Sequence, residues 1–205
     1  MYKRQQDDRL GPLVDPTRIG AFGFSQGGLT ILRTLGAEAN QQALLDHCDQ
    51  NGADDPEFCF AASESTLTRL GVLWNKATYT PPPFDPGQPV QDTRIKTAVI
   101  AAPVGAPITD LANVQRPLWL IRAGDNDQVN FPFHAEAVHQ SLPQSHDYTI
   151  LDGVGHYAFL SPFPESLKAE VGAPAEDPEG FDRAAFLEGL NQDIVAYFQR
   201  QLGSL

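Results

Sequence analysis

Three residue types that can cooperate in nucleophilic catalysis follow one another along the chain. Ser25 stands in the segment "RIGAFGFSQGG" of residues 18–28. An acid comes next, at Asp125 or Asp127, and His156 comes last. A serine hydroxyl becomes an effective nucleophile when a base takes its proton, and an acid must hold the ring of that base in the correct tautomer. This order of residues predicts a serine nucleophile with a histidine base.

Each of these residues follows a segment that is predicted to be a buried strand. The predicted strands are residues 18–24, 95–103, 116–124 and 146–153, and the first of them is apolar almost throughout. Helical spacing of apolar residues follows the first strand, recurs at 131–142 and ends the chain. Alternating strands and helices predict the α/β class, with a parallel sheet and right-handed crossovers. In such a sheet, ligands bind outside the carboxyl ends of the strands, where the serine, the acid and the histidine all lie.

The G-x-S-x-G spacing around Ser25 suits a sharp turn between a strand and a helix. Bulk at Gly23 or Gly27 would then clash with neighbouring elements, and the backbone N–H of Gln26 would point at the substrate oxygen as part of an oxyanion hole. Because glycine and serine are common residues, the motif alone is weak. The alternatives are a plain turn serine at this position and a plain turn histidine among glycines at His156.

The acid has two candidates on one loop. Asp125 and Asp127 both follow the third predicted strand, and the G-x-x-D spacing from Gly124 favours Asp127. The remaining histidines have no partner at metal-ligand spacing, so we expect them to be solvated: His47, His134, His139 and His146.

Length, charge and the motifs that the sequence lacks limit the classes of protein to which the chain can belong. The 205 residues suit a single domain, 1–205, and the formal net charge of −12 disfavours binding to nucleic acid. No run of 18 apolar residues occurs, which excludes a membrane-spanning helix. The chain has no CxxC pair and no HExxH motif, so we expect no metal site. The polar start "MYKRQQDDRL" is not a signal peptide.

Residues 37–94 form a polar, proline-rich insertion that we expect to shape a substrate pocket. A short helix is predicted near "SESTLTRLGVLW". Trp74, with Tyr79 and Phe84, either lines the pocket or packs the insertion; Phe24 and Tyr157 are the other pocket candidates. Cys48 and Cys59 could close a small disulfide loop or remain two reduced thiols.

The chain resembles the α/β-hydrolases, and more closely the family of predicted dienelactone hydrolases that is related to platelet-activating-factor acetylhydrolases. The resemblance implies Ser25 as nucleophile, His156 as general base and Asp127 as acid, in the hydrolysis of a small-molecule ester or related acyl compound without a cofactor. The chain departs from authentic dienelactone hydrolases, which use cysteine as nucleophile. In the position before the nucleophile it has Phe24, where relatives commonly have histidine or tyrosine. The segments that carry it are "DPTRIGAFGFSQGG", "RIKTAVIAAP", "HCDQ…DDPEFC", "GDNDQV", "GVGHYAFLSP" and "DPEGFDRAAFLEGLNQDIVAYF".

In the α/β-hydrolase fold the serine turn follows the fifth strand, whereas only 24 residues precede Ser25 here. The resemblance therefore implies the C-terminal portion of a hydrolase, with the strand at 18–24 at an edge and one oxyanion donor missing. A partner segment or chain would complete the sheet. A serine peptidase on the same fold, or an inactive fragment that needs its partner, are the alternatives. Relatives are often exported, which would suit a Cys48–Cys59 disulfide; the localisation of this chain stays open.

Overall fold

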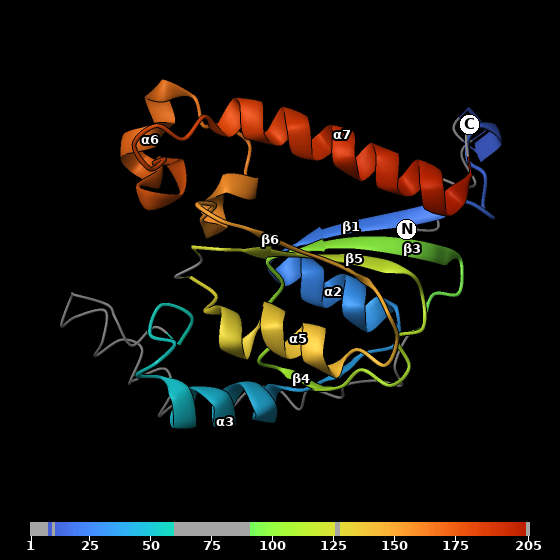
Figure 1. Ribbon diagram of the computed structural model, residues 1–205, viewed down its shortest axis with the longest axis horizontal. Coiled ribbons are helices and arrows are strands. Elements are labelled where there is room, and N and C mark those ends of the chain that lie inside the picture. The colour runs from blue at the N-terminus through green and yellow to red at the C-terminus, as the bar shows by residue number, and fades with distance from the viewer. Residues whose placement is uncertain (1–7, 10, 60–90, 126–127, 204–205) are drawn as a thin grey trace.

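A four-stranded parallel sheet forms the centre of the molecule. The computed structural model describes residues 8–9, 11–59, 91–125 and 128–203. The strands are ordered β1-β3-β5-β6, and their carboxyl ends lie along one edge of the sheet (Figure 1). Each strand lies inside one of the four predicted segments, so the α/β class with a parallel sheet is confirmed. The strands are β1 (Ile19–Phe24), β3 (Ile95–Ala101), β5 (Leu118–Ala123) and β6 (Asp147–Leu151).

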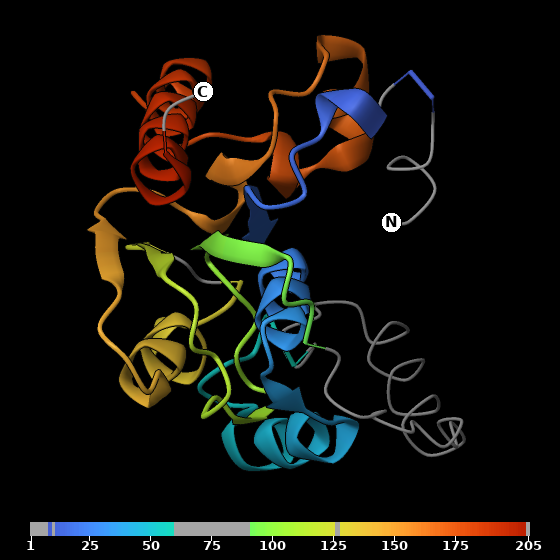
Figure 2. The same ribbon diagram turned by 90° about the vertical axis from the view of Figure 1, so that its right-hand side faces the viewer.

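Helices cover both faces of this sheet. The long helix α7 (Arg183–Leu202) lies on one face, and α2 (Gln26–Thr34) and α5 (Ala135–Ser141) lie on the other (Figures 1 and 2). Successive side chains of β3 alternate between the two cores: Val99 packs toward α7 and Ile100 toward α2, and both are fully buried. A central strand covered on both faces is largely apolar, which makes the segment of β3 recognisable in the sequence.

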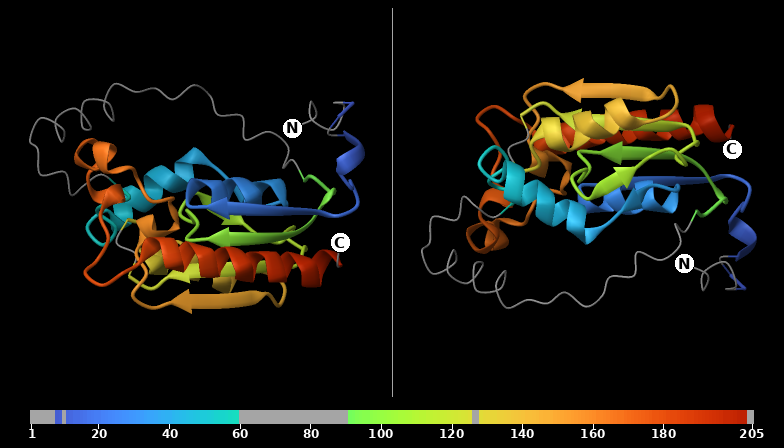
Figure 3. Two further views of the ribbon diagram at one scale, coloured as in Figure 1. Left: turned by 90° about the horizontal axis from the view of Figure 1, so that it is seen from above. Right: turned by 90° about the horizontal axis from the view of Figure 1, so that it is seen from below.

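The described part of the predicted insertion lies against the α2 and α5 face. There, β2 (Glu38–Ala39) pairs antiparallel with β4 (Ile108–Asp110), and α3 (Gln41–Asn51) follows β2 (Figure 3). The Asn40 side chain caps α3 by accepting a hydrogen bond of 2.8 Å from the backbone N–H of Ala43. The helix α3 was not among the predicted elements, although asparagine is a common N-cap. The helix predicted near "SESTLTRLGVLW" lies outside the described residues.

The C-terminal half contains further short elements. The helix predicted over 131–142 is divided at His134 into a 3₁₀ turn, η2 (Phe131–Phe133), and α5. Three more elements follow β6: η3 (His156–Phe159), α6 (Glu165–Val171) and η4 (Ala173–Ala175). At the other end of the chain, a 3₁₀ turn, η1 (Gly11–Leu13), precedes β1.

The start of β1 is tied to the end of α7. The guanidinium of Arg18 donates hydrogen bonds to the carbonyl oxygens of Leu202 (2.9 Å) and Gly203 (2.6 Å), which are end groups that the helix itself leaves without partners. Among the described residues β1 pairs with β3 alone, so it lies at an edge of the sheet, as expected for 18–24, and Phe22 is exposed. None of the described helices is long and apolar enough to cross a membrane.

Candidate active site

The backbone at Ser25 makes an abrupt turn between β1 and α2. Its φ of 54° and ψ of −119° lie in a region that residues with a side chain rarely occupy. The end of β3 and the turn that follows it hold this residue from both sides. The Ser25 N–H donates to the carbonyl of Ala101 (3.0 Å), and the N–H of Val104 donates to the carbonyl of Ser25 (3.1 Å). A strained position of this kind persists because its surroundings hold it in place.

The glycines around Ser25 are crowded to different degrees. A Cβ atom at Gly23 would clash with the carbonyl oxygen of Gly27, and one at Gly28 would lie 2.9 Å from Pro103. A Cβ at Gly27 would meet no described atom within 4 Å. The prediction that both flanking glycines avoid a clash is therefore confirmed for Gly23 and wrong for Gly27. The first turn of α2 directs position 27 outward and position 28 toward the end of β3.

The structure brings Ser25 and His156 together. His156 begins η3 just beyond β6, and its Nε2 lies 3.0 Å from the Ser25 Oγ. The imidazole is buried, and its centroid lies 4.8 Å from that of Phe24 and 5.5 Å from that of Tyr157. If Nε2 accepts the hydroxyl proton, Nδ1 must carry the proton of the neutral ring. The geometry is that of a hydroxyl next to a base.

The loop that follows β5 is joined to the loop that precedes His156. The Gly124 N–H donates to the Leu151 carbonyl (2.8 Å), and the Asp125 N–H donates to the Val154 carbonyl (3.1 Å). A Cβ at Gly124 would lie 2.7 Å from the Leu151 oxygen, so the approach depends on glycine. Asp125 itself is exposed, and Asp127 lies outside the described residues. The choice of Asp127 as the acid therefore stays a prediction.

The other predicted site residues are placed as follows. Gln26 is the exposed first residue of α2, so its backbone N–H is one of the groups at the positive end of that helix. Tyr157 donates from its hydroxyl to Oε1 of Gln128 at 2.8 Å. Phe24 packs between His156 and Phe159, whose ring centroid is 5.4 Å away. Trp74, Tyr79 and Phe84 lie outside the described residues.

A second cluster of ionisable groups lies away from Ser25, and no prediction from the sequence included it. The Asp55 carboxylate is fully buried, and its Oδ2 lies 2.9 Å from His47 Nε2 and 2.7 Å from His134 Nε2. Its Oδ1 accepts a hydrogen bond from the Asn130 N–H at 3.3 Å. The expectation that His47 and His134 are solvated is therefore wrong. His139 and His146 are also partly buried, with Nδ1 of the first 2.8 Å from Nε2 of the second.

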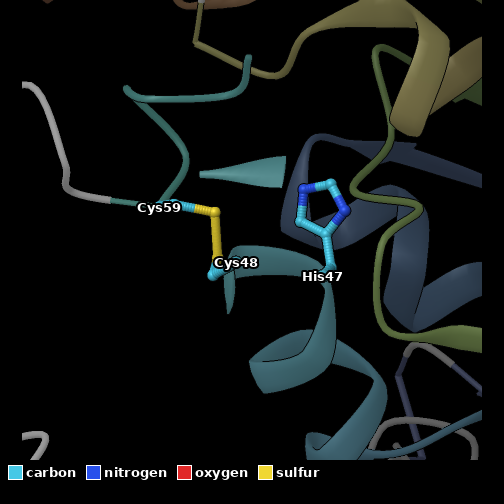
Figure 4. A group of neighbouring side chains, drawn as sticks. All are labelled: His47, Cys48 and Cys59. Atoms are coloured by element: carbon cyan, nitrogen blue, oxygen red, sulfur yellow. A yellow bond between two sulfur atoms is a disulfide. The ribbon is translucent and has the colours of Figure 1, made fainter. Parts of the chain in front are cut away.

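A disulfide closes the loop that carries Asp55. Cys48, near the end of α3, is bonded to Cys59, and Figure 4 shows His47 next to this bridge. A loop of this length typically gains about 3 kcal/mol of stability from closure. His47 and the two sulfur atoms lie within 4.8 Å of one another, but sulfurs bonded to each other are not the thiolates that bind metal ions.

In the buried cluster, the Asp55 carboxylate lies between the rings of His47 and His134. Burial raises the pKa of Asp55, but hydrogen bonds from His134 and His47 outweigh it and hold that pKa below its usual value. Burial lowers the pKa of His134, which the bond to Asp55 only partly opposes. Nδ1 of His134 accepts from the N–H groups of Gly105 (3.0 Å) and Ala106 (3.3 Å), so the proton of the ring is on Nε2.

This tautomer bears on metal binding. Nε2 of His134 donates its proton to Asp55 and has no lone pair to offer, although His47, Asp55 and His134 have ligand atoms within 4.8 Å of one another. The arrangement therefore serves as a hydrogen-bond network in the interior. No single segment of the sequence predicts this network, because its three members come from α3, the disulfide loop and the start of α5.

Comparison with known proteins adds no relative. The chain matches no protein-family model, no curated protein and no solved structure.

Proposed function

We propose that this chain is a serine hydrolase that cleaves carboxylic esters on an α/β-hydrolase fold. Ser25 is the nucleophile, His156 the general base, Asp127 the acid that orients it, and the Gln26 N–H an oxyanion donor. The observation that carries the proposal is the 3.0 Å contact between Ser25 Oγ and His156 Nε2, two residues 131 positions apart in the chain. The strained backbone at Ser25 and its place at the start of α2 support the same conclusion.

The reaction proceeds in two halves. Ser25 Oγ attacks the ester carbonyl carbon while His156 Nε2 takes the hydroxyl proton, and negative charge develops on the carbonyl oxygen. The N–H of Gln26 and the positive end of α2 stabilise that charge. Collapse of the tetrahedral species breaks the bond to the alcohol, which leaves with the proton from His156. Water, deprotonated by the same ring, then attacks the acyl-enzyme and releases the carboxylic acid and free Ser25.

The surroundings of the pair suit an apolar acyl or alcohol group. Phe24 and Tyr157 place aromatic rings against the imidazole from two elements. Such rings exclude water from the base and offer apolar contact to a substrate.

Covalent labelling tests the assignment of the nucleophile. The wild-type protein, Ser25→Ala and the control Ser141→Ala are treated with a fluorophosphonate, and the modified residue is identified by mass spectrometry. We expect label on Ser25 in the wild type and in Ser141→Ala, and no label in Ser25→Ala. Undiminished labelling of Ser25→Ala, or an unlabelled wild type, contradicts the proposal. Turnover of p-nitrophenyl esters compared with peptide anilides then separates an esterase from a peptidase.

A further inference from the structure

We infer that His134 is a positioning residue for Ser25, which acts through the turn that follows β3. The inference rests on the proposed function for its effect on catalysis, but the contact it describes is structural. His134 lies outside the Ser25–His156 pair and is fully buried at the start of α5. Its ring is connected to the nucleophile by a short series of backbone hydrogen bonds.

The first link is between the ring and the turn. Nδ1 of His134 accepts hydrogen bonds from two consecutive backbone N–H groups, those of Gly105 and Ala106. Gly105 is packed against the histidine backbone, since a Cβ there would lie 2.7 Å from both the Cα and the carbonyl oxygen of His134. The turn is itself strained, because Ala102 has a φ of 40°. A strained turn needs an external partner to hold it, and the imidazole supplies one.

The second link is between the turn and Ser25. The residue before Gly105 is Val104, and its N–H donates to the carbonyl oxygen of Ser25 at 3.1 Å. The same oxygen accepts from Gly28 within the start of α2 (2.9 Å), so the bond from Val104 is the one that joins it to the β3 turn. Movement of residues 104–106 would therefore shift the Ser25 backbone, and with it the hydroxyl that faces His156.

The third link fixes the ring itself. Nε2 of His134 donates to Asp55 at 2.7 Å, and Asp55 also accepts from His47 and from the Asn130 backbone. The disulfide loop thus holds the carboxylate, the carboxylate sets the tautomer and angle of the ring, and Nδ1 faces the turn with its lone pair. The two ring nitrogens make different hydrogen bonds, and a substitution can remove either bond and keep the other. This difference gives a test.

Two matched substitutions separate the two bonds of the ring. In His134→Asn the amide oxygen takes the position of Nδ1 and can still accept from the turn, while the bond to Asp55 is lost. In His134→Gln the amide nitrogen takes the position of Nε2 and can still donate to Asp55, while the two N–H groups of the turn lose their acceptor. Both variants remove one side of a buried ring, so a purely structural role would affect them alike.

The readouts are the hydrogen-exchange rate of the Val104 amide and the rate of fluorophosphonate labelling of folded protein. We expect His134→Gln to exchange the Val104 amide faster and to lose roughly 10²-fold in labelling rate and in kcat, with little change in KM. In His134→Asn, the Val104 amide should stay protected from exchange, and the labelling rate and kcat should fall by about threefold or less. Equal effects of the two variants on labelling, or unchanged Val104 exchange in His134→Gln, overturn the inference.

A variant at another position covers the case in which His134→Gln does not fold. Gly105→Ala leaves the ring intact but pushes the turn away from it, and it should give the same faster exchange at Val104 and slower labelling. Wild-type exchange and labelling in Gly105→Ala would overturn the inference. Failure of the wild-type protein to label at Ser25 would instead refute the proposed function, and Val104 exchange would still decide whether the ring holds the turn.

Discussion

His156 and His134 are two buried histidines with opposite surroundings. Nε2 of His156 faces a hydroxyl, Ser25 Oγ, from which it can take a proton. His134 faces a carboxylate at one nitrogen and two backbone N–H donors at the other, so a second proton has no place on the ring. The residue type is the same in both. The partner of each ring nitrogen decides whether the histidine exchanges protons or serves as a fixed part of the interior.

The largest expected effect separates these histidines by activity. His156→Ala should lower kcat for ester hydrolysis by about 10⁴-fold or more, because the base is lost, while the urea midpoint changes little. His139→Ala, on α5, serves as the control for removal of a partly buried imidazole. Steady-state kinetics and urea unfolding measure both quantities. Wild-type turnover in His156→Ala would place the base elsewhere.

Removing the carboxylate of the second cluster should instead act on stability. Asp55→Ala leaves two rings and a backbone N–H facing a gap, and we expect the free energy of unfolding to fall by about 3–5 kcal/mol. The neighbouring Asp54 is exposed and bonds to Asn130 through its backbone carbonyl, which alanine retains, so Asp54→Ala is the matched control. Urea unfolding monitored by tryptophan fluorescence measures the difference. Equal stability of the two variants would show that the network is dispensable.

The glycines of the Ser25 turn give a smaller, internally controlled effect. Gly23→Ala should lower the free energy of unfolding by about 2 kcal/mol, because its Cβ would meet the Gly27 carbonyl and Ile31. Gly27→Ala should be neutral or slightly stabilising, since the position is open and alanine favours a helix. Thermal unfolding of both variants measures the contrast. A larger loss in Gly27→Ala than in Gly23→Ala would contradict the described turn.

The smallest effect is the acid sensitivity of the second cluster. The pKa of His134 is lowered from its usual 6.5, so the unfolded chain takes up a proton before the folded one does. Its contribution to stability is complete above about pH 6.5 and is lost as pH falls below that value. The lowered pKa of Asp55 acts in the same direction at lower pH.

We therefore expect His134→Asn to flatten the decline in stability below pH 6.5, by up to about 1 kcal/mol per pH unit. Urea unfolding of both proteins at pH 7.5, 6.5 and 5.5 measures it. Parallel curves for the variant and the wild type would show that another group causes the decline.

The sequence was sufficient to predict an element where the residues of a single segment show its pattern. All four strands of the sheet could be predicted from local patterns, since apolar residues predominate in β3 and β5 and recur in the edge strands β1 and β6, which expose Phe22 and Ile150. The order of Ser25 and His156, each just beyond a strand, predicted their meeting at one edge of the sheet because parallel strands share that edge. The residues 41–51 were missed as a helix, since α3 has no buried residue and little apolar periodicity.

The sequence by itself thus determined the α/β class, the positions of the strands and the pair of residues that face each other at 3.0 Å. The tertiary structure alone decided which histidines are buried with which partners. Asp55 and His134 are 79 residues apart and follow no common motif, so only folding brings them into contact. A buried charge requires partners from wherever the chain can supply them, and that choice depends on packing in three dimensions.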